Sequence, residues 1–168
     1  MLRAQSLYSF ESTTGAAHDP SAAARRTDAA NSGQVEGAVR VTLRLEGLFV
    51  LIAAAITYAK SGFGWGAFAL FFLAPDLSFL GYLAGNRIGA IAYNAAHSYV
   101  GALACFGAAL IGNEPALEAA AMIWCAHIGF DRAMGYGLKY ATGFGVTHLG
   151  LIGRAARDGG PAASETVA

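Results

Sequence analysis

Residues that could do chemistry gather in the stretch "IWCAHIGFDRAMGYGLKY", residues 123–140. His127 and Asp131 are four positions apart in it and would share one face of a helix. Asn94 and His97 are three apart and would share a face in the same way. Helical bundles build metal sites from imidazole and carboxylate groups that project inward from facing helices. These pairs therefore predict a divalent-metal site, with zinc, manganese or iron as the candidate ions.

A complete site needs ligands from further segments. Asp76 follows Pro75, and a proline breaks the helical backbone so that the chain there can line a polar cavity. The predicted metal ligands are Asp76, His97, His127 and Asp131, with His148 as a closing ligand. For catalysis we predict Glu46 as the general base and Arg132 and Lys139 as a clamp for a phosphate group.

Each of these polar groups also has a purely structural interpretation. The alternatives are an ion pair of Glu46 with Arg132, a helix cap at Asp76, a carbonyl bond at His97, a buried pair of His127 with Asp131, and a surface position for His148. A haem with His97 and His127 as axial ligands is a further alternative. The convergence of the polar groups at one depth, described below, favours a functional site.

The composition indicates a membrane protein. Hydrophobic residues make up 55% of the 168 and charged residues only 13%, and the mean hydropathy is +0.45. A soluble domain carries about a quarter charged residues. Eleven basic and eleven acidic residues cancel, which argues against nucleic acid as the main partner. The predicted partner is the lipid bilayer.

Four apolar stretches are long enough, or nearly so, to cross a membrane, which takes about 20 helical residues. They are Leu43–Ala59, Phe63–Ala84, Ile88–Ile111 and Pro115–Met134. Short links join them, so neighbours should run antiparallel. The prediction is an all-α integral membrane four-helix bundle with its second helix broken at Pro75-Asp76. Residues 135–150 are rich in glycine and aromatic residues and are predicted to form an interfacial segment.

Both ends of the chain differ from this apolar part. Residues 1–40 and 153–168 are small and polar and are predicted to be disordered, which leaves 41–152 as the membrane domain. Basic residues near the spans collect on the side that would hold both termini, which predicts cytoplasmic termini. With this orientation every span places a polar group within about 15 Å of the cytoplasmic boundary.

Several long motifs resemble those of one family. They are "LRLEG", "FLAPDLSFLGYLAGNRIGAIAYNAAHSY", "WCAHIGFDRAMGYGLKY" and "GFGVTHLG", and together they extend over about residues 43–150. They resemble the domain of unknown function 4260 family of small, mostly bacterial, membrane proteins. The resemblance implies a compact helical domain in the bacterial inner membrane with the polar residues at motif positions, and it implies no activity.

Two classes of function are compatible with these residues. The "PD" motif with nearby histidines has a weaker similarity to membrane-bound metal-dependent hydrolases, although "PDLS" lacks their second acid. A metal-dependent hydrolase of a lipid-linked or amphiphilic substrate is the first hypothesis. The alternatives are a structural or accessory membrane subunit, and a small proton or solute transporter. A homo-oligomer is compatible with each of them.

Overall fold

The structure is a computed structural model that describes residue 35 and residues 37–158. Most of the two tails predicted to be disordered lies outside the described residues. Parts of both tails that are described are helical, because helix α2 begins at Gly37 and a short helix α7 covers Arg154–Asp158. The ordered domain therefore extends a few residues beyond each predicted boundary.

The described chain is mostly helical, as predicted. Its helices are α2 (Gly37–Ala59), α3 (Trp65–Phe72), the 3₁₀ helix η1 (Ala74–Ala84), α4 (Asn86–Ala96), α5 (Tyr99–Gly112), α6 (Pro115–Met134) and α7. Two short antiparallel strands, β1 (Val146–Thr147) and β2 (Gly150–Leu151), lie between α6 and α7. The helix boundaries follow local chemistry: Pro115 opens α6, and Gly135 closes it with a left-handed φ of 94°.

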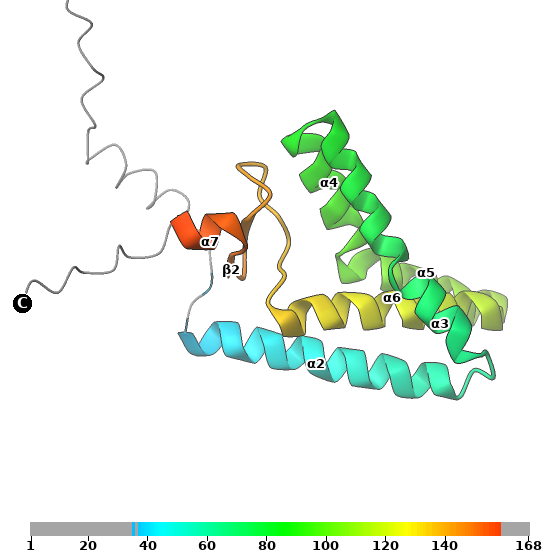
Figure 1. Ribbon diagram of the computed structural model, residues 1–168. Helices are drawn as coiled ribbons and strands as arrows, with labels where there is room; N and C mark the ends of the chain where they lie inside the picture. Colours follow the sequence, from blue (N-terminus) through cyan, green and yellow to red (C-terminus); the bar gives the residue numbers. More distant parts are fainter. Residues whose placement is uncertain (1–34, 36, 159–168) are drawn as a thin grey trace, which may run out of the picture.

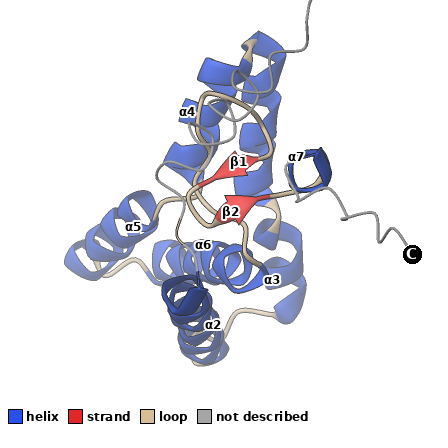
Figure 2. Cartoon of the chain, turned by 90° about the vertical axis from the view of Figure 1, so that its left-hand side faces the viewer, coloured by secondary structure: helices blue, strands red, loops and turns tan. Residues whose placement is uncertain are grey.

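Helix α6 lies at the centre of the fold (Figures 1 and 2). Helix α2 packs antiparallel along it, while α5 and α3 contact it from opposite sides. Helices η1 and α4 pair as a hairpin that rises steeply from this layer. The second and third predicted spans therefore separate over part of their length, with α3 and α5 on either side of α6, instead of forming one parallel-sided bundle.

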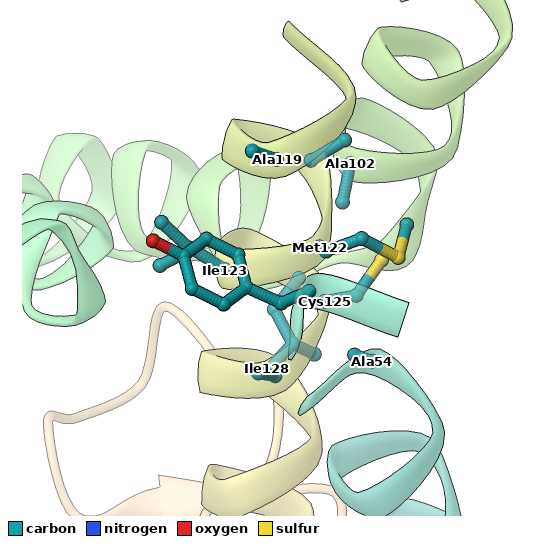
Figure 3. Close-up of a cluster of buried hydrophobic side chains, with 10 residues drawn as sticks. Ala54, Ala102, Ala119, Met122, Ile123, Cys125 and Ile128 are labelled. Atoms are coloured by element: carbon teal, nitrogen blue, oxygen red, sulfur yellow. The ribbon is translucent and has the colours of Figure 1, made fainter. Parts of the chain in front are cut away.

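Small residues let the central helices approach closely. At Gly129 of α6, an added Cβ atom would lie 2.7 Å from the carbonyl oxygen of Gly47 and 2.7 Å from the amide nitrogen of Leu51, both on α2. Above this contact, Ala54 of α2 and Ala102 of α5 meet the α6 side chains in the hydrophobic core (Figure 3). Close backbone approach through small residues is typical of helix packing in membranes.

Two of the predicted spans are broken. The break before Asp76 is confirmed, because α3 ends at Phe72 and η1 begins with Pro75 in its first turn. A second break was not predicted: the span Ile88–Ile111 is divided between α4 and α5 at His97 and Ser98. No proline or glycine marks this break, and its cause lies in contacts with α6 that are described below.

Two helical segments of the described chain are long and apolar enough to cross a membrane. They are Trp65–Ala84, which contains α3 and η1, and Asn86–Gly112, which contains α4 and α5. The sequence predicted four membrane-crossing spans.

We predict that Gly129→Ala lowers the free energy of unfolding by about 2–3 kcal/mol, because the added methyl group meets backbone atoms of α2 that cannot rotate away. Thermal denaturation of the detergent-purified protein measures this. Gly107→Ala is the matched control: nothing lies within 4 Å of a Cβ there, so the higher helix propensity of alanine should leave stability equal or up to about 1 kcal/mol higher. Equal effects at the two positions would contradict the close α2–α6 contact.

Candidate metal centre

Three segments far apart in the sequence bring their side chains to one point. Asp76 comes from η1, His97 from the break between α4 and α5, and His127 from α6. Their ligand atoms all lie within 4.8 Å of one another, a spacing that could hold a metal ion. The Nε2 atoms of the two histidines are 3.1 Å apart. Asp76 Oδ1 lies 3.3 Å from Nε2 of His97 and 3.6 Å from Nε2 of His127.

These distances match the edges of a metal coordination sphere. Zinc ligands about 2.0–2.1 Å from the ion in tetrahedral geometry lie about 3.3–3.4 Å from each other. The three observed edges fall on either side of that value. The side chain of His97 is 0% exposed and that of His127 2%, whereas that of Asp76 is 35% exposed. The cluster is therefore buried on the histidine side and open on the side of the aspartate.

Hydrogen bonding fixes the tautomer of His97. Its Nδ1 lies 3.0 Å from the carbonyl oxygen of Tyr93, which can only accept, so Nδ1 carries the hydrogen. In the neutral ring, Nε2 then presents a lone pair to the carboxylate oxygen of Asp76. Two acceptors at this distance repel each other unless a proton or a metal ion lies between them. A backbone carbonyl on the far nitrogen is also the usual outer partner of a metal-binding histidine.

A second carboxylate stands beside the three ligands. Asp131 Oδ2 accepts a hydrogen bond of 3.1 Å from the hydroxyl of Tyr93, and it lies 3.6 Å from Nε2 of His97 and 3.9 Å from Nε2 of His127. Asp131 is one turn after His127 on α6, as the sequence spacing predicted. It is outside the three-atom group but within reach of anything bound there.

Aromatic rings hold the two imidazoles in place. The ring of Tyr93 stacks on that of His97, with centroids 3.8 Å apart and planes 14° apart. The ring of Phe72 meets His127 edge to face at 5.3 Å. Within the described chain, His127 Nδ1 is buried without a hydrogen-bond partner, so only its Nε2 is engaged, and that atom faces the cluster.

Side chains of α6 stabilise the break at His97. A broken helix frees backbone carbonyls, which must find other donors in an apolar environment. The indole nitrogen of Trp124 donates to the carbonyl of Ala96 at 2.6 Å, and Arg132 Nη2 donates to that of His97 at 2.9 Å. Sequence analysis missed Trp124 altogether. The only signal in the sequence for this arrangement was the placement of an arginine at the end of an apolar helix.

Arg132 is therefore placed differently from the predicted phosphate clamp. Its guanidinium also donates to the carbonyl of Tyr136 at 2.8 Å, and the residue is 8% exposed. One backbone carbonyl accepts from each of its terminal nitrogen atoms, and these two bonds tie the end of α6 to the break. The structure thus gives Arg132 a structural position next to the ligand His97.

Lys139 is buried in an aromatic pocket beside the cluster. It is 5% exposed, and its Nζ donates to the carbonyl of Phe144 at 3.0 Å. Nζ also lies over three rings, 3.7 Å from the centroid of Phe144, 4.7 Å from that of Tyr93 and 5.5 Å from that of Phe79. Loss of hydration lowers the pKa of Lys139 to about 8. The predicted role at an exposed interface does not fit this burial.

The C-terminal segment packs against the η1–α4 hairpin. Asn94 of α4 accepts from the amide of Lys139 at 2.7 Å and donates to its carbonyl at 2.8 Å, so it holds this segment by its backbone. His148 lies farther along, where its Nδ1 accepts from the amide of Leu138 at 2.8 Å. Burial lowers the pKa of His148. Its imidazole, predicted as a closing ligand, is outside the group formed by Asp76, His97 and His127.

Two further predictions can be compared with the observed positions. Glu46, predicted as the general base, is exposed on α2, and α2 contributes none of the three clustered side chains. A haem held by His97 and His127 is excluded by geometry. Axial ligands lie on opposite faces of the porphyrin, which does not fit between nitrogen atoms 3.1 Å apart.

The fold and the cluster define a small helical protein with a buried His/His/Asp group of metal-binding geometry. The chain belongs to a family described as Domain of unknown function (DUF4260), whose model matches residues 40–152. The resemblance inferred from the motifs is thereby confirmed. Comparison with curated proteins and with solved structures gave no match.

We predict that Lys139→Met reduces the pH dependence of stability above pH 8. The pKa of Lys139 is lower in the folded than in the unfolded chain, where it is 10.5. Between these two values the unfolded chain binds more protons, so the free energy of unfolding rises with pH, by on the order of 3 kcal/mol over the window. Denaturation of wild type and variant at several pH values measures this rise. A difference between the two proteins that stays constant with pH would contradict a lowered pKa.

Proposed function

We propose that the helical domain is embedded in the bacterial inner membrane as a four-span bundle, with both termini in the cytoplasm. The two long apolar segments support this, as do large hydrophobic side chains on the outer surface. The most exposed of them are Leu83, Ile111, Val100, Leu70 and Phe49, all at least 70% exposed. Such a surface suits lipid contact far better than water. The excess of basic residues on one side supports the orientation.

We further propose that the cluster binds a divalent metal ion, with Asp76, His97 and His127 as ligands and zinc, manganese or iron as the ion. One observation supports this most directly: the Nε2 lone pair of His97 faces the carboxylate of Asp76 at 3.3 Å, with Nε2 of His127 close to both. A cation at this point turns the repulsion between acceptors into coordination. Three protein ligands with one open side are typical of catalytic rather than structural metal sites.

The reaction that this arrangement supports best is hydrolysis of a membrane-associated substrate. A metal ion held by Asp76, His97 and His127 would supply a Lewis acid, which would lower the pKa of a bound water molecule and polarise a carbonyl or phosphoryl oxygen. Asp131 takes the proton of that water, a role that the sequence assigned to Glu46, and Tyr93 holds its carboxylate through the hydroxyl bond. For an ester, the water oxygen bonds to the carbonyl carbon, the C–O bond breaks, and the alcohol leaves with the proton from Asp131.

We predict near-stoichiometric divalent metal in wild-type protein purified in detergent without chelators, and its loss in His127→Ala. Mass spectrometry of the metal content checks this. His148→Ala is the matched control and should keep the metal, because this histidine lies outside the three-ligand group. In the same preparations, Asp131→Asn should keep the metal and lose about 10²–10⁴-fold in ester or phosphoester hydrolysis.

A metal-free wild type would contradict the proposed metal centre. Protons shared between the histidines and carboxylates would then fill the gap between the acceptors, and the cluster would be a structural or proton-handling network. Metal that survives His127→Ala would contradict the assigned ligands. If the wild type binds metal but neither it nor any variant hydrolyses an ester or phosphoester, only the proposed reaction is contradicted.

The membrane proposal has its own test. The full-length protein should sediment with membranes, remain there after an alkaline carbonate wash, and dissolve only in detergent, because the apolar outer surface is stable only in contact with lipid or its substitutes. Quantitative immunoblotting of the fractions measures this. Release by carbonate would show a peripheral protein and contradict the spans.

A further inference from the structure

A large apolar cavity adjoins the candidate metal centre. It has a volume of about 620 Å³, in the range of small-molecule binding sites. Its walls come from the end of α2, Phe63, α3, η1, the end of α4 and the first half of α6. Apart from the hydroxyl groups of Tyr58 and Ser78 and the indole of Trp124, the lining side chains are hydrocarbon. A cavity with this lining suits an apolar ligand.

The cavity lies next to the cluster on three separate elements, although Asp76, His97 and His127 themselves are not among the residues that line it. On η1 the wall residue Pro75 directly precedes the ligand Asp76. At the end of α4 the wall residue Ala96 directly precedes the ligand His97. On α6 the wall residue Ile123 is one turn before the ligand His127, on the same face. One end of the cavity therefore lies beside the candidate metal centre.

Helix α6 provides the long wall of the cavity. Ala116, Ala119 and Ala120 are on the face that leads through Ile123 to His127. Their small side chains leave room for a ligand beside the helix. The lining residues of α6, from Ala116 to Trp124, extend over about 12 Å of the helix axis. This length accommodates part of an extended hydrocarbon chain.

One polar group of the wall is left for a ligand. The hydroxyl of Tyr58 donates to the carbonyl of Gly64 at 2.9 Å, and the indole of Trp124 is engaged with α4. The hydroxyl oxygen of Ser78 is buried and has no hydrogen-bond partner among the described residues. Ser78 is two residues after Asp76 on η1, so the wall of the cavity contains a buried hydroxyl group that has no partner in the described chain. Buried polar atoms of this kind call for a partner.

We propose that the cavity holds the single hydrocarbon chain of an amphiphilic substrate whose polar head group lies at the metal centre, with Ser78 bonded to the head group. This inference rests on the proposed function and names its substrate class: a long-chain acyl ester or a similar single-chain lipid. The chain is buried against α6, and the bond to be cleaved is held between Asp131 and the three ligands.

The test compares two hydroxamates on full-length protein loaded with Co²⁺, whose absorption reports ligands that bind the metal. Acetohydroxamate carries the metal-binding head alone, and a long-chain alkyl hydroxamate adds the tail. We expect the long-chain compound to bind at least about tenfold more tightly, because each buried methylene group contributes to affinity. Ala120→Phe fills the cavity and should remove this gain while leaving the affinity for acetohydroxamate unchanged.

Two further variants serve as controls. Ala108→Phe adds the same ring at an exposed position of α5 that does not line the cavity, and it should keep the full gain from the tail. Ala116→Phe, at the far end of the cavity, gives the same comparison if Ala120→Phe does not fold. A long-chain alcohol without a metal-binding head is the control for lipid that merely fills apolar space.

The outcomes separate this inference from the proposed function. An undiminished gain from the tail in both cavity variants would overturn the inference and leave the metal centre intact. An alcohol that binds as tightly as the long-chain hydroxamate would also overturn it, since the cavity would then hold membrane lipid unconnected with the centre. Failure of wild type to bind Co²⁺ would overturn the proposed function, and the inference would fall with it.

Discussion

The structure depends on one constraint: a helix that breaks in apolar surroundings must find donors for the carbonyls that it frees. At the break between α4 and α5 these donors are Trp124 and Arg132, both on α6. Because these bonds hold the break open, the chain can turn at His97 and direct its Nε2 toward His127. The geometry of the candidate metal centre thus follows from backbone hydrogen bonding as much as from the ligands themselves.

Much of the helical organisation could be predicted from the sequence, because the signals are local. Pro75 breaks the second span and Pro115 opens α6, as expected from the missing amide hydrogen of proline. Spacing along a helix correctly placed His127 and Asp131 on one face. The meeting of Asp76, His97 and His127 was predicted from a common depth in the membrane, and the structure brings these three side chains together.

The remaining features depend on tertiary contacts that leave no local signal. The residues around His97 read as a continuous helix, and donors from α6 stabilise the break that the structure has there. Lys139 looked like an interfacial charge, yet aromatic rings from three segments enclose it. Arg132 was expected to meet a phosphate group, but backbone carbonyls are its partners. For Lys139 and Arg132, the sequence shows the charge but not the packing that surrounds it.

The central place of α6 has a consequence for biosynthesis. Helix α6 is the last long helix to be made, yet α2, α3, α5 and η1 all contact it. Until it emerges from the ribosome, α2 lacks its main packing surface and the break at His97 lacks both donors from α6. The earlier helices must therefore remain in an incomplete arrangement until α6 is made, and assembly of the core and of the candidate metal centre becomes a single late event.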